Sequence, residues 1–196
     1  MQERGPKVAF EPGMLARYFV VLGAALAFAN RAPAQSRVGA DSSTRLNRLE
    51  RDLTYGTAMG FGYAAIDQLG TQPPEWGTGW PGYTRRLASN VGEFWIQEIT
   101  TEGLAWVMNR PLDYQPCRCR DAGDRTWHAV RGAVFDQTPK GERLAIPRIV
   151  GAYGGAYAQT TWRPSGGSSR TNLTLVNGTT SLAIGAVINL YHEFRH

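Results

Sequence analysis

Apolar residues recur at helical spacing along most of the chain beyond residue 42, and small residues interrupt them at two places. Gly56 and Gly60 lie four apart within 43–69, and Gly151 and Gly155 lie four apart within 146–164. Glycines at this spacing share one helix face and let another backbone approach closely. The pattern predicts an all-α, glycine-rich bundle of four to five helices. In this bundle 146–164 is the central buried helix, and the two glycine faces are candidate partners.

The glycine faces have two interpretations. They relieve crowding between helices in a water-soluble core, or they pack helices together in lipid. Arg48, Arg51 and Asp67 break up the apolar stretch around Gly56 and Gly60. These charges favour the soluble core.

Further helices are expected at 83–108 and 125–138, where large apolar residues again follow helical spacing. Proline and glycine fill residues 70–82 and forbid a continuous helix there. Residues 109–124 are rich in turn-forming residues, and 164–169 form a flexible linker. These breaks separate the predicted helices.

The C-terminal segment admits two structures. Residues 171–191 contain no charged side chain, which is a length that could span a bilayer, although asparagine and threonine dilute it. Residues 182–190 also alternate as a strand would, and Phe194 near the end is typical of the closing strand of an outer-membrane barrel. A barrel needs many such segments. The helical order of 83–108 therefore favours the bundle.

The N-terminus indicates export. Residues 14–36 combine Arg17, an apolar run at 18–29 and the small-residue site Ala32-Pro33-Ala34. This is a secretory signal peptide cleaved after Ala34, because the run is shorter than the roughly 20 residues of a spanning helix; an uncleaved anchor is the alternative. We expect residues 1–34 to be an N-terminal extension and signal peptide, and 35–196 a single helical domain in the periplasm or associated with the outer membrane.

The charge excludes one class of partner. The formal net charge is +5, and removal of residues 1–34, with four basic and two acidic side chains, leaves +3. The arginines are scattered rather than clustered, so the chain lacks the basic stripe that a nucleic-acid footprint requires. We expect no nucleic-acid binding.

The only two cysteines, Cys117 and Cys119, lie in the turn-rich segment 109–124. In an exported chain they are expected to form a disulfide, and a bridge over one residue closes a small ring that is comparatively easy to reduce. Intermolecular bridges, or a soft-metal site completed by another chain, are the alternatives. Two thiolates fall short of a zinc site, and the haem-attachment motif is absent. No metal or cofactor is therefore predicted.

Two tryptophans, Trp76 and Trp80, stand out in the proline-rich loop. They are candidates for an interface, either as an anchor at lipid headgroups or as a lid over a ligand. The favoured interpretation is that they fold back over the edge of the core, because an indole ring buries a large area.

Catalytic chemistry has weak support. Glu98 and Glu102 lie four apart on one helix face, which we interpret as an acidic stripe facing water. His128 could act as a base near neutral pH if a carboxylate from Glu93, Glu98 or Glu102 stood beside it. No catalytic residue is predicted with a defined role.

Three stretches together resemble an uncharacterised family of exported bacterial proteins: PPEWGTGWPGYTRRL, RIVGAYGGAYAQTTWRP and TTSLAIGAVINLYHEF. The shared motifs are Pro-Pro-Glu-Trp-Gly, Gly-Ala-Tyr-Gly and a C-terminal Glu-Phe, and the likeness extends over 55–194. It departs at 110–114, where the family pattern is closer to Asp-Pro-Arg-Tyr. The resemblance implies no activity, cofactor or catalytic residue.

Two functions remain. The favoured one is a non-enzymatic envelope module that packs against a membrane surface, an envelope protein or a second copy of the chain. The alternative is a small periplasmic enzyme or ligand-binding domain centred on His128 and a helix carboxylate. The alternative requires His128 to lie within hydrogen-bond reach of a carboxylate in a cleft.

Overall fold

The computed structural model describes residues 42–138 and 141–195, so the predicted signal peptide lies outside the described residues. The described part contains five α-helices, a short 3₁₀ helix and one β-hairpin. Its elements are α2 (Ser42–Leu69), η1 (Pro74–Trp76), α3 (Gly79–Val107), α4 (Ala122–Arg131), β1 (Phe135–Thr138), β2 (Gly141–Leu144), α5 (Ile146–Gln159) and α6 (Arg170–Phe194). The predicted all-α bundle of four to five helices is confirmed.

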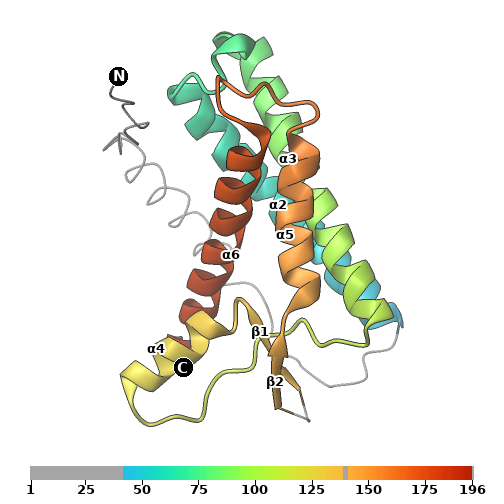
Figure 1. Cartoon of the computed structure of the whole chain (residues 1–196), viewed down its shortest axis with the longest axis vertical. Helices are drawn as coiled ribbons and strands as arrows, with labels where there is room; N and C mark the ends of the chain where they lie inside the picture. Colours follow the sequence, from blue (N-terminus) through green and yellow to red (C-terminus); the bar gives the residue numbers. More distant parts are fainter. Residues whose placement is uncertain (1–41, 139–140, 196) are drawn as a thin grey trace, which may run out of the picture.

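The four longer helices pack in a row. α2 packs on α3, α3 on α5, and α5 on α6, while α4 lies against α6 (Figure 1). The helices of the row stand side by side, so the row has two faces at the ends of their axes. The hairpin and α4 lie together at one of these ends, and the loops that join α2 to α3 and α5 to α6 lie at the opposite end. α5, predicted as the central helix at 146–164, lies between α3 and α6. α3 is equally internal, because it lies between α2 and α5.

The two glycine faces do not meet each other. An added Cβ at Gly56 or Gly60 would touch Phe94 or Val91 of α3, and one at Gly151 or Gly155 would touch Gln97 of the same helix. Both faces therefore pack on α3, and the expected pairing of one glycine face with the other is wrong. Close backbone approach on two flanks of one helix explains why the chain carries two such faces.

The interior contains small and polar side chains. Among the described residues, every fully buried hydrophobic side chain is an alanine. The largest buried side chains are Arg86, Gln159, Glu193 and Pro147. Large apolar side chains lie outside instead, for example Phe61, Ile99 and Leu175, each at least 50% exposed. Buried charged and polar side chains of this size are uncommon in a water-soluble domain unless they are paired.

Arg86 explains how the proline-rich loop is held. Its guanidinium group is buried and donates to the carbonyl oxygens of Gln72, Pro73 and Gly77 and to the side chain of Gln68. The loop is shorter than predicted, because α3 begins at Gly79 rather than near residue 83. Pro81 lies in the first turn of α3, where its missing N–H costs nothing.

The predicted helix at 125–138 is wrong in its second half. α4 begins after Asp121, whose side chain accepts hydrogen bonds from the backbone of Gly123 and Asp124, and it ends at Arg131. Residues 135–138 form β1, which pairs antiparallel with β2 so that Phe135 lies opposite Leu144. The hairpin extends from the end of the bundle, and every residue of β2 is exposed.

The C-terminal segment is a helix throughout. Ser169 caps α6 by accepting a hydrogen bond from the backbone of Asn172. The strand interpretation of 182–190 is wrong, because Gly178 packs against Tyr153 and Asn189 against α4 at helical, not alternating, spacing. Helical packing on α5 and α4 therefore decided the structure of a sequence that fitted both patterns.

Candidate functional site

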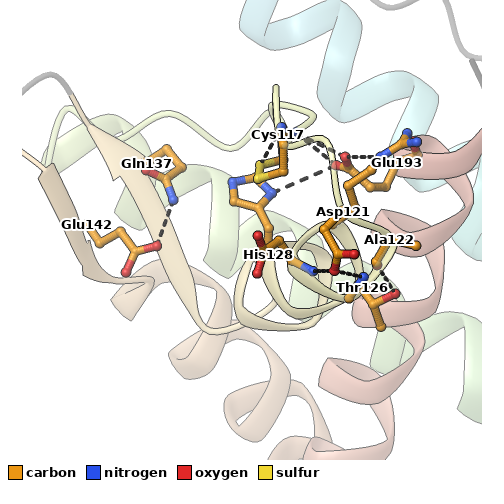
Figure 2. The surroundings of a disulfide bond; sticks show 12 residues. Cys117, Asp121, Ala122, Thr126, His128, Gln137, Glu142 and Glu193 are labelled. Atoms are coloured by element: carbon orange, nitrogen blue, oxygen red, sulfur yellow. Dashed lines mark hydrogen bonds and ion pairs between the residues drawn. A yellow bond between two sulfur atoms is a disulfide. The ribbon is translucent and has the colours of Figure 1, made fainter.

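A buried glutamate joins three segments at one end of the bundle. Glu193, in the last turn of α6, accepts a hydrogen bond of 2.6 Å from the hydroxyl of Tyr114. It also accepts bonds of 2.9 and 3.2 Å from the backbone N–H of Cys117, and it pairs with Arg125 at 3.1 Å (Figure 2). Arg125 donates to the backbone carbonyl of Glu193 as well. We call residues 108–121, between α3 and α4, the cysteine loop. The carboxylate ties this loop and α4 to the end of α6.

These donors set the ionisation of the cluster. Burial acts to raise the pKa of Glu193, but the hydrogen bonds from Tyr114, Cys117 and Arg125 outweigh it and hold the pKa below its ordinary value. Burial and the bond to Glu193 raise the pKa of Tyr114. Glu193 is therefore a charged acceptor and Tyr114 a neutral donor.

His128 does meet a carboxylate, but not the expected one. Its Nδ1 lies 2.9 Å from the hydroxyl of Tyr114 and 3.8 Å from Glu193, while the predicted partners Glu93, Glu98 and Glu102 all lie on α3. Because Tyr114 donates to Glu193, Nδ1 of His128 must donate to Tyr114. The second ring nitrogen points away from Glu193, toward the side of β1 (Figure 2).

The depression beside His128 is small. It is lined by Tyr114, His128, Asp136 and Arg148, among others, and its space for a water-sized molecule is about 10 Å³. That volume suits one water molecule, whereas ligand sites typically enclose about 300–1,000 Å³. Asp136 is 3% exposed, and both of its carboxylate oxygens lack a hydrogen bond from the described residues. A bound water would satisfy Asp136.

Cys117 and Cys119 lie at disulfide-bonding distance, with Cα atoms 5.2 Å apart. The pairing within one chain agrees with the first of the three interpretations of these cysteines. A loop this short restricts the unfolded chain little, so the chain-entropy gain is about 1–2 kcal/mol, at the low end for a disulfide. Stabilisation alone is a weak reason for this bridge.

The acidic residues of α3 do not form a stripe facing water. Glu102 is 7% exposed and lies 3.7 Å from Arg48, and Glu93 and Glu98 are half-buried. The prediction is wrong because α3 is flanked by helices on two sides.

Among the described residues, no group of three or more potential ligand side chains could hold a metal ion.

The two tryptophans of the loop differ in their surroundings. Trp76 is half-buried, and the guanidinium of Arg163 lies 5.9 Å from its ring centre. Trp80 is 75% exposed and stacks on Tyr83 with ring centres 5.6 Å apart. The expectation that both rings cover the core edge is wrong for Trp80, which is available to a partner or a lipid surface.

Sequence reasoning did not find Glu193, Tyr114 or Arg125 as a cluster. The three residues come from α6, from the loop after α3 and from α4. The Glu-Phe at 193–194 was noted in the sequence, but it indicates none of the partners of Glu193. No periodicity within one helix could have joined them.

α6 is the one helix among the described residues with the length and apolarity of a membrane span. Only 17% of its apolar window is buried inside the protein. Most residues of this window are half-buried, and Leu175, Val176 and Ala183 are exposed.

Comparison with known proteins identifies no relative: no family model, no curated protein and no solved structure matches this chain.

Proposed function

We propose that this chain is an exported, non-enzymatic module of the cell envelope, held in a lipid bilayer by α6, the one described helix that is long and apolar enough to span it. The proposal depends on one observation, a belt across the four helices of the row. We define the belt as residues 53–66, 87–101, 149–162 and 171–191. Its only charged residues are Glu93 and Glu98, both half-buried.

The four parts of the belt lie at one level. Gly56 and Gly60 meet α3 at Phe94 and Val91, Gly151 and Gly155 meet it at Gln97, and Gly178 meets α5 at Tyr153. The exposed large apolar or aromatic side chains of the belt are Phe61, Trp95, Ile99, Val150, Tyr157, Trp162, Leu175 and Val176. Lipid supplies no hydrophobic force between helices, so small residues at helix contacts and apolar residues outside are what a bilayer selects.

The polar interior agrees with the same setting. Within the belt Gln159 bonds to Asn90 and Asn177, and Trp162 bonds to Ser89. Such bonds hold helices together in lipid, where polar side chains face the interior of the bundle. The charged residues of the described chain otherwise gather beyond the belt, at its two ends.

The test is fractionation of cells that make the full chain, followed by an alkaline carbonate wash of the membranes and mass determination. We expect a product that begins near Gln35 and stays in the washed membrane. Release of the whole product in soluble form would show that the belt is a protein–protein surface or a soluble exterior, and embedding would be wrong.

A matched pair of variants tests whether the middle of α6 lies in lipid. Ala183 is exposed in the middle of α6 and Thr171 is exposed at its start. Ala183→Arg places a charge in the bilayer, at a cost of about 2.5–3.5 kcal/mol at a helix centre, so we expect less protein in the washed membrane. Thr171→Arg, beside Arg170, should insert like the wild type. Equal behaviour of the two variants contradicts the proposal.

A further inference from the structure

The cysteine loop is the part of the described chain where a reactive pair of atoms meets solvent. Cys117 and Cys119 are half-buried, and their neighbours Arg118 and Arg120 are exposed. The loop lies beyond the belt, at the end of the row that carries α4 and the hairpin. The position of the loop outside the belt is the basis for considering an external thiol as its partner.

The two sulfurs are held unequally. The sulfur of Cys117 accepts a hydrogen bond of 3.2 Å from the backbone N–H of Cys119. Within the described chain, the sulfur of Cys119 accepts none. The backbone of Cys117 is fixed by its bonds to Glu193. A donor beside a sulfur favours the thiolate form, so negative charge is better accommodated on Cys117 than on Cys119.

We propose that the Cys117–Cys119 pair is a thiol–disulfide exchange site that oxidises anionic thiols. The short ring makes the bridge comparatively easy to reduce. The exposed guanidinium groups of Arg118 and Arg120 attract a thiol that carries carboxylates, and nearby positive charge also stabilises a cysteine thiolate.

The exchange runs in two displacements. The thiolate of the first substrate attacks the sulfur of Cys119, the S–S bond breaks, and its electron pair leaves on Cys117 as a thiolate. A second substrate thiolate then attacks the substrate sulfur of the mixed disulfide, and Cys119 leaves as a thiolate. The two cysteines take up the two protons that the substrate thiols released. Two thiols become one disulfide, and the cysteine pair becomes a dithiol.

The surroundings let the bridge be reduced without unfolding the bundle. The bonds from Tyr114 and Arg125 to Glu193 involve neither sulfur, so reduction of the bridge does not require breaking them. The backbone bond from Cys117 to Glu193 also precedes the ring in the chain. The cluster therefore anchors one end of the loop in both redox states.

The first experiment uses the full mature chain in mild detergent, equilibrated with mixtures of reduced and oxidised glutathione. Samples are quenched with acid, alkylated and weighed by mass spectrometry. We expect the pair to pass from oxidised to reduced within the glutathione series, with one oxidised glutathione formed per reduced chain and the thermal unfolding temperature little changed. If reduction requires denaturant, or coincides with unfolding, the bridge is a structural cross-link and the proposal is overturned.

A pair of variants tests the assignment of the two sulfurs. Cys119→Ser leaves Cys117 as the only thiol, and Cys117→Ser leaves Cys119. We expect iodoacetamide near pH 7 to alkylate Cys117 about 3–10-fold faster than Cys119, because the rate follows the thiolate fraction. Equal rates, or the reverse order, would remove Cys117 as the leaving group. The glutathione titration of the wild type does not depend on how these variants fold.

The charge requirement has its own test. Reduction rates are compared between glutathione, which carries net negative charge, and cysteamine, which is cationic, each corrected for its thiolate fraction. We expect glutathione to react faster, with an advantage that shrinks as salt is added. The double variant Arg118→Gln and Arg120→Gln should abolish the advantage. An advantage that persists in this variant would contradict recruitment by the two arginines.

Discussion

The hydroxyl group of Tyr114 donates a hydrogen bond of 2.6 Å to the buried carboxylate of Glu193, although 79 positions separate the two residues in the chain. This bond fixes the loop after α3 to the last turn of α6. Because Arg125 of α4 and the backbone of Cys117 reach the same carboxylate, Glu193 organises the end of the fold that carries the cysteines.

Removal of the charge at Glu193 should destabilise the protein. Glu193→Gln keeps the side-chain volume but loses the ion pair with Arg125. It also places an amide N–H₂ group where Tyr114, the backbone of Cys117 and Arg125 all donate hydrogen bonds. We expect the free energy of unfolding to fall by about 3–5 kcal/mol, as for other broken buried pairs. Tyr114→Phe removes one bond to a charged group and should cost about 1.5–3 kcal/mol. Denaturant titration followed by tryptophan fluorescence measures both, and a loss below about 0.5 kcal/mol for Glu193→Gln, the size of an ordinary surface substitution, would refute the account.

Acid should weaken the same cluster. The folded protein holds the pKa of Glu193 below its ordinary value of 4.5. A carboxyl of this kind stabilises the fold above the ordinary pKa, and the contribution is lost as the pH falls from about 4.5 through the folded-state pKa. We expect the unfolding temperature of the wild type to drop over this range more steeply than that of Glu193→Gln. Glu75→Gln, at an exposed position, should keep the wild-type profile. Identical slopes for all three proteins would rule out Glu193 as the titrating group.

A methyl group at Gly151 should separate α3 from α5. An added Cβ would meet the side-chain oxygen of Thr101 and lie 2.8 Å from the backbone carbonyl of Gln97, which cannot move alone. Gly151→Ala should therefore cost about 1–3 kcal/mol through overpacking. Gly154→Ala is the matched control in the same helix, because its Cβ would meet nothing within 4 Å. The control should be neutral or gain up to about 1 kcal/mol of helix propensity. If both variants lose the same stability, close approach at Gly151 is not the reason.

Arg86 should be essential to the proline-rich loop, and its neighbour should not. Arg86→Gln strips donors from the carbonyls of Gln72, Pro73 and Gly77, at a cost of about 1–3 kcal/mol for each acceptor left buried and unpaired. Arg85 is exposed, so Arg85→Gln should change stability by less than about 0.5 kcal/mol. Limited proteolysis with mass spectrometry should find new cleavage between residues 70 and 82 in Arg86→Gln alone. An uncut loop would show that other contacts hold it.

The boundaries of the helices could be predicted where local signals are strong. Gly70 ends α2 after Leu69, as predicted. α5 ends at Gln159 rather than at 164, where the first proline stands, and α4 begins at Ala122, after the capping Asp121, rather than at 125. The hairpin was missed because residues 135–138 satisfy both a helical and an extended pattern, and the partner strand lies beyond the predicted helix.

The position of the candidate site could not be predicted. Glu193, Tyr114 and Arg125 come together because α6 packs on α5 and α4, and no local pattern reports that packing. The expected partners of His128 failed for the same reason, since Glu93, Glu98 and Glu102 lie on α3 while His128 lies on α4.

The sequence by itself determined three properties: the chain is helical, small residues at known positions permit close helix contacts, and known segments lack charge. These properties follow from spacing and side-chain size, which act within one helix. Only the tertiary structure decided which surfaces the glycines face, that Arg86, Gln159 and Glu193 are buried, and that Glu193 binds the loop of Cys117. Each of these depends on contacts between residues distant in the chain, and their geometry is set when the helices pack.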